Sequence, residues 1–272
     1  MSVFAWAAKL RCAFVQSRIY FVIKKTLFFA ALFILSLLGF LVATLPANIV
    51  WYNVLEPYVV HKALGLKVSS VQGTVWSGKA QIDYQRLPFI IDWDVKLSGL
   101  LGLKLPLSVD LHSQAGDINI YAEVGLGDAE LILRKVDVDL SQLTPLVKTS
   151  RIRLDGQLLA KNVRAVLQNQ KLISLVGLAS WSGGDIAYPA GREIHERTLP
   201  SFHMQSKTDA NGEITLGIRD STATFDVISL RVDTKGVALV KVARRLLDLS
   251  DEAWPVNSRE TDIVFKVKKA IY

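Results

Sequence analysis

The residues best placed for chemistry lie in the segment VQGTVWSGKA, residues 71–80, where Trp76 and Ser77 stand between two glycines. A serine among glycines suggests the nucleophile turn of hydrolases, which requires the pattern G-x-S-x-G on a strand-to-helix turn. Here Val75 lies two residues before Ser77 and Gly78 follows it directly, so the glycine positions do not match. The segment predicts no catalytic serine, and an exported hydrolase is the least favoured function.

Two other interpretations of this segment remain. Glycines ease a bulge or a tight bend in a sheet, and a neighbouring tryptophan can cover the backbone that they leave bare. We favour this structural role, with stacking of a carbohydrate or lipid on the indole ring as the alternative. If the ring of Trp76 is buried, its replacement by alanine should destabilise the protein by about 3–5 kcal/mol.

The tripeptide Trp-Ser-Gly recurs 105 residues later, in LVGLASWSGGDI at 175–186. In both places an apolar run containing a glycine leads into the tripeptide, and a second apolar run follows. Recurrence at a fixed offset indicates a duplicated unit. The sequence therefore predicts two halves, 68–145 and 146–272, and the same structural role for Trp181 and Gly183.

The other titratable side chains do not indicate a catalytic, cofactor or metal site. His195, in GREIHERT, lacks the second histidine of an H-E-x-x-H zinc site and is expected on a solvated loop. Asp92 with Asp94, and Asp137 with Asp139, have the two-residue spacing of the solvated face of a strand. We predict no catalytic residue, no cofactor and no bound metal.

A long apolar run, TLFFAALFILSLLGFLVATL at 26–45, contains no charge and no proline. As a helix it would be about 30 Å long, which is the thickness of a bilayer core. We interpret it as a retained transmembrane helix. The alternatives are a cleaved signal peptide, whose apolar region is usually shorter, and a buried core helix, which would show a polar face.

The flanking charges predict the orientation of this helix. Five cations and no acidic residue precede it, the last two being Lys24 and Lys25, and the first charge after it is Glu56. The positive-inside rule leaves residues 1–25 as a cytoplasmic tail and exports the rest. That exported part has 27 Lys and Arg against 25 Asp and Glu, so the basic pI reflects topology, and no nucleic-acid partner is indicated.

After a connector at 46–67 the hydrophobic period changes to two. LKLPLSVDLH, 103–112, alternates leucine or valine with other residues, as a half-buried strand does. Pro106 cannot donate a ladder hydrogen bond, which predicts an edge strand or a bulge. Similar runs follow, and Asn-Gly at 211–212 predicts a type I′ hairpin turn. Residues 68–272 are therefore expected to form an antiparallel sheet.

One helix is expected near the C-terminus. GVALVKVARRLLDL, 236–249, places Leu239, Val242, Leu246 and Leu249 on one helical face. We expect this helix to pack on the sheet, because its apolar face is narrow and contains no aromatic residue. A helix lying on the membrane surface is the alternative.

The order of these elements resembles a known family. The anchor, then LPANIVWYNV, then GLKVSSVQGTVWSGKAQI, is similar to the type II secretion system protein N (general secretion pathway protein N) family. Members carry G-T-x-W-x-G-x-A at this position, which here is Gly73, Thr74, Trp76, Gly78 and Ala80. The motif is short, while the anchor, the length and the strand-rich remainder agree over most of the chain.

The resemblance implies a non-enzymatic accessory or adaptor subunit, held in the bacterial inner membrane with its N-terminus cytoplasmic and its β-rich domain periplasmic. It also implies an elongated, curved antiparallel sheet of the AsmA-like kind. The implied partners are other secretion subunits, namely the outer-membrane channel or the inner-membrane linker subunit, and inner-membrane lipid. The alternative is an AsmA-like groove that binds or transfers lipid, because a curved sheet with one apolar face can hold acyl chains.

Overall fold

The computed structural model describes residues 25–56, 66–147, 151–169, 171–190, 193–252 and 257–270. The predicted cytoplasmic tail with Lys24, and part of the predicted connector, lie outside these residues. The chain divides into two compact units, Met1–Pro46 and Ala47–Tyr272.

The first unit contains the helix Lys25–Ala43. It is the one helix in the described ranges that is long and apolar enough to cross a membrane. Its large apolar side chains are exposed all around it; Leu27 is 64% and Phe33 68% exposed. A helix that is apolar on every side suits a bilayer rather than a protein surface in water. This geometry is compatible with the predicted single-pass anchor.

The second unit begins with a short helix, α2 (Ala47–Val50), and a π-helical turn, η1 (Trp51–Leu55). Its strands follow in the order β1 Leu66–Gly73, β2 Ser77–Tyr84, β3 Leu87–Val95, β4 Leu105–Ser113, β5 Gly116–Val124, β6 Asp128–Asp139, β7 Arg153–Leu154, β8 Gln157–Gln168, β9 Lys171–Trp181, β10 Gly184–Ala190, β11 Glu193–Leu199, β12 Phe202–Thr208, β13 Ile214–Asp220, β14 Ile228–Val232, β15 Val237–Ala243 and β16 Ile263–Ala270. Short helices interrupt them at η2 (Leu97–Gly102), η3 (Leu140–Leu143), α4 (Thr144–Val147) and α5 (Arg244–Leu249). The unit is mainly β, as predicted.

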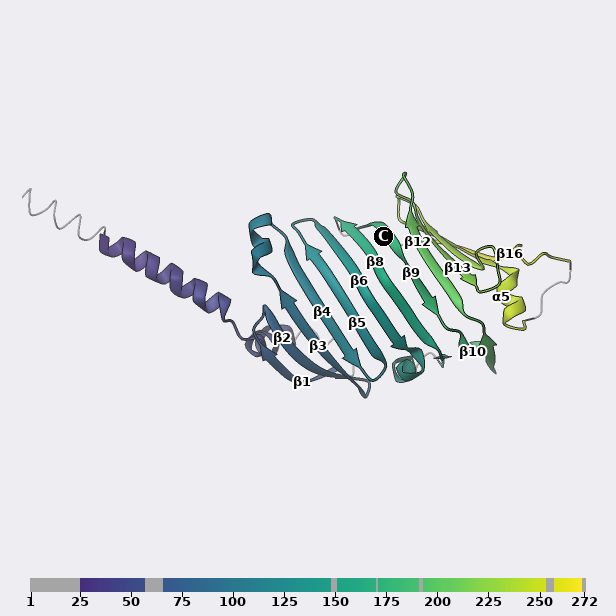
Figure 1. Ribbon diagram of the computed structural model, residues 1–272, viewed down its shortest axis with the longest axis horizontal. Coiled ribbons are helices and arrows are strands. Elements are labelled where there is room, and N and C mark those ends of the chain that lie inside the picture. Colours follow the sequence, from purple (N-terminus) through teal and green to yellow (C-terminus); the bar gives the residue numbers. More distant parts are fainter. Residues whose placement is uncertain are drawn as a thin grey trace, which may run out of the picture. The chain divides into compact units, whose positions relative to one another are not determined.

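Thirteen of these strands form one antiparallel sheet, in the order β1-β2-β3-β4-β5-β6-β8-β9-β12-β13-β14-β15-β16 (Figure 1). The chain leaves this sheet for β7 and again for β10 and β11, which make a separate three-stranded sheet. β6 and β8, on either side of the predicted boundary at 145–146, pair along their length. One sheet therefore spans both predicted halves, while their origin by duplication stays a prediction.

The register of the large sheet gives one cross-strand row in which every strand contributes an apolar residue. We call it the apolar row: Val71, Ala80, Ile91, Leu111, Ile118, Val136, Ala160, Ala179, Met204, Ile218, Ile228, Val242 and Phe265. Because successive side chains of a strand point to opposite faces, this row defines an apolar face.

The adjacent row lies on the other face and is mostly polar. We call it the polar row: Gln72, Lys79, Asp92, Asp110, Asn119, Lys135, Lys161, Leu178, Gln205, Gly217, Ser229, Lys241 and Lys266. Apolar and charged side chains are thus segregated across the whole width of the sheet, as in antiparallel sheets that face water on one side.

The expectation that the strand at 103–112 lies at an edge or carries a bulge is wrong. β4 is interior, between β3 and β5, and its pairing with each of them is regular. Pro106 is tolerated because it lies where β3 ends: Val95 pairs with Leu107, and the Lys96 N–H donates to the carbonyl oxygen of Pro106 at 2.9 Å. The missing N–H of Pro106 therefore faces the end of a strand rather than its middle.

Two further expectations are corrected near the C-terminus. Residues 237–243 form strand β15, and helix α5 is confined to Arg244–Leu249. The predicted hairpin between β12 and β13 exists, but Gly212 is the residue of its turn with a positive φ, +79°, and Asn211 is not. Asp209 accepts hydrogen bonds from the backbone N–H groups of Asn211 and Glu213, both at 2.9 Å. The turn is not type I′, which needs two residues with positive φ.

His195 lies on strand β11 and not on a loop. Its Nδ1 is 2.8 Å from Oε1 of Glu252, to which the Tyr188 hydroxyl also donates, at 2.7 Å. These two contacts, with that of His195 the stronger, hold the pKa of Glu252 below its usual value. The cluster joins the three-stranded sheet to the segment that follows α5.

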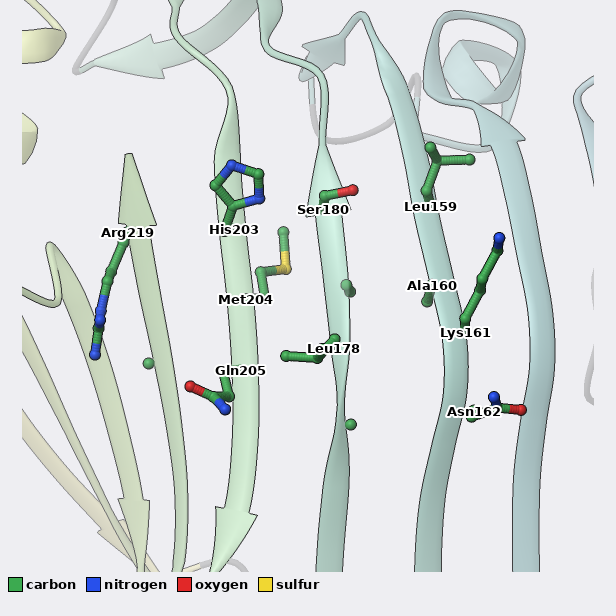
Figure 2. Close-up of a pocket in the computed structure, with 13 residues that line it drawn as sticks. Leu159, Ala160, Lys161, Asn162, Leu178, Ser180, His203, Met204, Gln205 and Arg219 are labelled. Carbon is green, nitrogen blue, oxygen red and sulfur yellow. The ribbon is translucent and has the colours of Figure 1, made fainter. Parts of the chain in front are cut away.

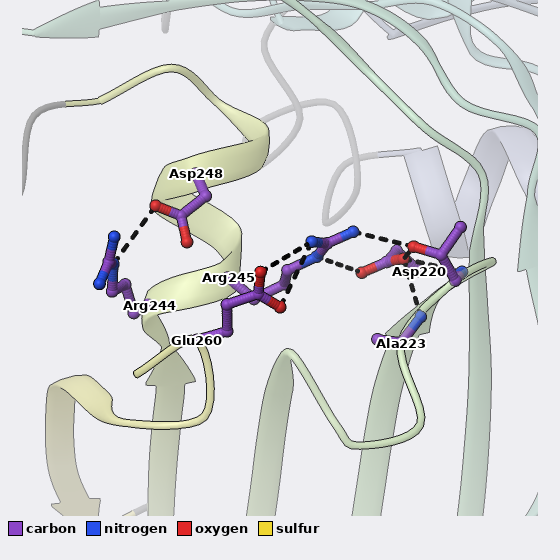
Figure 3. Close-up of polar contacts among 7 residues, drawn as sticks. Asp220, Ala223, Arg244, Arg245, Asp248 and Glu260 are labelled. Atoms are coloured by element: carbon purple, nitrogen blue, oxygen red, sulfur yellow. Dashed lines mark hydrogen bonds and ion pairs between the residues drawn. The ribbon is translucent and has the colours of Figure 1, made fainter. Parts of the chain in front are cut away.

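A buried ion pair joins α5 to the end of β13 (Figure 3). The side chain of Asp220 is 1% exposed, and its Oδ2 accepts from Nε of Arg245 at 3.2 Å. Oδ1 accepts from the hydroxyl and the backbone N–H of Thr222, at 2.6 and 2.8 Å, and from the N–H of Ala223 at 3.0 Å. Arg245 also contacts Glu260 at 3.4 Å, so the network extends to the segment before β16.

Candidate functional site

The first tryptophan motif forms the turn between β1 and β2. Gly73 has φ of +92°, a conformation that suits glycine. The Thr74 hydroxyl accepts from the N–H groups of Trp76 and Ser77, at 3.3 and 3.2 Å, and the Thr74 N–H donates to the carbonyl oxygen of Ser77. The carbonyl oxygen of Trp76 accepts from the N–H of Val95. The motif thus fixes a tight turn against the end of β3.

The ring that covers Gly78 belongs to Trp93 rather than to Trp76. Gly78 and Trp93 are direct cross-strand partners on β2 and β3. A Cβ atom placed on Gly78 would lie 2.5 Å from Cζ2 of Trp93 and in close contact with the carbonyl oxygen of Gln72. Trp76 is half-buried. Its alternation with Asp92 and Asp94 places Trp93 on the apolar face of the strand. The sequence does not show that its ring covers Gly78.

We predict that Gly78→Ala lowers the free energy of unfolding by about 1–3 kcal/mol, because the added methyl group overpacks the ring of Trp93. Gly102→Ala is the matched control, since nothing lies within 4 Å of a Cβ atom at that position. Thermal melting of the full-length variants in detergent, followed by circular dichroism, measures both. Equal melting temperatures for the two variants would contradict the prediction.

The second motif lies at the end of β9, where the chain leaves the large sheet for β10. Trp181 is 6% exposed and stacks on Phe202, with ring centroids 5.8 Å apart and an interplanar angle of 6°. Its indole N–H donates to the carbonyl oxygen of Asp155 at 2.8 Å. The Ser182 hydroxyl accepts from the N–H of Gln157 at 2.8 Å. Trp181 therefore ties β8, β9 and β12 together at one end of the sheet.

Two glycines allow close packing at this junction, Gly156 against Trp181 and Gly183 against the backbone after β11. Gly156 has φ of +96°, and a Cβ atom there would lie 2.7 Å from Nε1 of Trp181. Gly183 has φ of +80°, and its Cβ atom would lie 2.7 Å from the carbonyl oxygen of Leu199. The two tryptophan motifs are separated by five strands of the sheet and are not brought together. They hold two different junctions of the fold.

A groove of about 770 Å³ crosses β8, β9, β12 and β13 (Figure 2). Its lining includes two exposed apolar side chains, Leu159 (41%) and Leu178 (61%), beside the basic groups of Lys161, His203 and Arg219. The Nε of Arg219 already pairs with Asp226 at 2.7 Å. The groove interrupts the polar row with an apolar patch.

The described residues include no group of three or more His, Cys, Asp or Glu side chains arranged to hold a metal ion. His112 contacts Asp117 at 2.7 Å and His195 contacts Glu252. The hydrogen-bond partners of these two histidines are therefore carboxylates and not the serines of the tryptophan motifs. Asp92 and Asp94 share the polar face, as their spacing predicted, and Lys79 lies 3.2 Å from Asp92.

The apolar row crosses all thirteen strands of the large sheet. Of the thirteen residues in the apolar row, Ala80, Val136 and Ala160 are buried, each 8% exposed, whereas Phe265 is 51% exposed. The remaining nine are half-buried. In a closed sandwich a second sheet would cover such a row. Here nine of its residues keep part of their surface accessible to solvent.

A family description, Type II secretion system (T2SS), protein N, matches residues 64–248, which is more than half of the chain. The chain belongs to the type II secretion system protein N family. A curated relative, the Type II secretion system protein N of Aeromonas hydrophila, is 27% identical over 176 residues, covering 62% of this chain and 67% of the relative. No solved structure matches the chain.

Family membership makes this chain a component of the type II secretion system, and such a component interacts with other subunits of that machine. The matched region begins just before β1 and ends within α5. It includes both tryptophan motifs, the groove and most of the large sheet. The part of the chain that matches the family is therefore mainly the large sheet.

Proposed function

We propose that this protein is a non-enzymatic adaptor that is held in the inner membrane by the helix Lys25–Ala43, with its cytoplasmic end before the helix and its sheet in the periplasm. The charge asymmetry around the helix supports this orientation. Family membership supports a role in secretion. The sheet would present its surface to the outer-membrane channel or to the inner-membrane linker subunit.

The observation that carries this proposal is the apolar row, which crosses thirteen strands and is mostly half-buried. A large apolar patch that is only partly covered marks an interaction site in a folded protein. The tryptophan motifs have a supporting part in the proposal: Gly73, Thr74, Trp76, Gly78, Ala80, Trp181 and Gly183 keep the sheet in shape rather than contact the partner.

A second candidate function uses the same face. The apolar row has no polar interruption, and at about 4.8 Å per strand it extends roughly 60 Å. Acyl chains could lie along such a surface. The protein would then bind or transfer inner-membrane lipid, and the membrane helix would keep the sheet near its source.

Photo-crosslinking in the native membrane tests both functions. A photoreactive residue replaces Val109, on the apolar face of β4, or its neighbour Asp110, in the polar row. We expect Val109 to capture secretion subunits and Asp110 to capture few, because the two side chains point to opposite faces. Capture of lipid alone from Val109, with no protein from either position, would overturn the adaptor role and favour lipid binding.

A further inference from the structure

The end of the large sheet at β15 and β16 differs in charge from the rest. Lys241 on β15 and Lys266 on β16 lie directly opposite each other, and Lys268 follows on the same face. Across the described part of the chain, no ion pair joins any of these three lysines to an acidic group. Lysines that face each other on neighbouring strands repel and destabilise a sheet.

Some cations elsewhere on this face have acidic partners. Lys79 lies 3.2 Å from Asp92. Lys135 also faces a lysine on the neighbouring strand, but Asp137 lies 3.3 Å from its ammonium group. Lys161 and Lys207, on interior strands, also have no ion pair among the described residues, so β15 and β16 differ in carrying three such lysines together at an edge of the sheet.

The backbone of β16 is arranged to accept another strand. Among the described strands its one neighbour in the sheet is β15, and after a register shift between Val242 and Ala243 their pairing is regular from Phe265 to Ala270. At the other edge of the sheet, β1 has a register shift between Val68 and Ser70, a device that disrupts an edge. On the apolar face of β16, Val267 is 59% exposed, and Lys269 lies two residues further along the same face.

We propose that β16 binds an extended segment of a partner subunit by strand addition, and that this segment alternates acidic with apolar side chains. Its acidic groups would lie on the polar face beside Lys241, Lys266 and Lys268, and its apolar groups would continue the apolar face beyond Val267. A second copy of this chain is a poor occupant, because pairing β16 with itself brings its lysines together. The inference rests on the proposed adaptor function. It adds which edge of the sheet binds the partner and which kinds of side chain the partner segment carries.

A peptide experiment tests the chemistry. The full-length protein in detergent is titrated with a short peptide of alternating valine and glutamate, or with one of alternating valine and lysine. We expect the glutamate peptide alone to slow amide hydrogen exchange in β16, and Lys266→Glu with Lys268→Glu to weaken its binding about tenfold. The matched double change, Lys161→Glu with Lys207→Glu, lies on interior strands and should leave binding unchanged. Equal binding of both peptides, or protection away from β16, would overturn the proposal.

A crosslinking experiment separates this inference from the adaptor function. A photoreactive residue is placed at Val267 or at Val109 in the native membrane. Capture of a secretion subunit from Val267, through a segment that alternates acidic and apolar residues, supports the inference. Capture from Val109 without capture from Val267 overturns strand addition at β16 and leaves the adaptor function standing. Capture from neither position overturns both.

Discussion

Replacing Trp181 with alanine is expected to lower the free energy of unfolding by about 3–5 kcal/mol. The ring is 6% exposed and stacks on Phe202, so its removal leaves a cavity at the junction of β9 and β12. The change also leaves the carbonyl oxygen of Asp155 without the indole N–H that it accepts at 2.8 Å. Both losses destabilise the fold.

Two variants control this prediction. Trp181→Phe keeps most of the stacking area and loses the hydrogen bond, so we expect a loss of about 1–2 kcal/mol. Trp76→Ala should also cost less than Trp181→Ala, because the ring of Trp76 is only half-buried. Melting of each full-length variant in detergent, followed by circular dichroism, ranks them. A larger effect at Trp76 than at Trp181 would show that the first motif is the main support of the sheet.

Replacing Asp220 with alanine is expected to lower the free energy of unfolding by about 3 kcal/mol, because it removes the buried partner of Arg245 and the acceptor of three hydrogen bonds. Arg245 would lose its buried carboxylate and keep the contact with Glu260, whose side chain is 57% exposed. The N–H groups of Thr222 and Ala223 would lose their acceptor as well. Asp92→Ala is the control. It breaks a surface pair with Lys79 and should change the free energy of unfolding by less than about 1 kcal/mol.

The stabilisation from Asp220 should also depend on pH. Burial by itself would raise the pKa of this carboxyl, but hydrogen bonds from Thr222 and the guanidinium of Arg245 outweigh it and hold the pKa below its usual value. A depressed pKa stabilises the fold above the unfolded-state pKa of about 3.9, and this stabilisation is lost as the pH falls through the folded-state pKa. The stability difference between the wild-type protein and Asp220→Asn should be constant near neutral pH and should shrink below about pH 4. A difference that grows on acidification would contradict this assignment.

Local patterns were sufficient to predict most of the strands. The alternation at 103–112 and the apolar run that leads into Trp181 correspond to β4 and β9, because a half-buried strand has a period of two. Segment 236–249 was misread because its residues fit both periods. Pairing of β15 with β14 and β16 decides in favour of a strand for its first part, and a pattern within the segment itself does not reveal this pairing.

The rows could not be predicted from the sequence. Whether Val71 aligns through eleven intermediate strands with Phe265 depends on every turn and bulge between them, and a shift of one residue exchanges the two faces. The register shift between Asn119 and Ile120 is one such bulge, and no local sequence pattern predicts it. The burial of Asp220 was missed for the same reason, since Arg245 is brought to it by tertiary packing.

The order of the strands bears on how the domain reaches its native state. Apart from the two places where the chain leaves for the small sheet, each strand pairs with the one that precedes it. Proteins with contacts that are mostly local in sequence fold faster than those that must close long loops. The sheet can therefore grow strand by strand from β1 while the rest of the chain is still emerging. No strand of the large sheet pairs with a strand from the far end of the polypeptide.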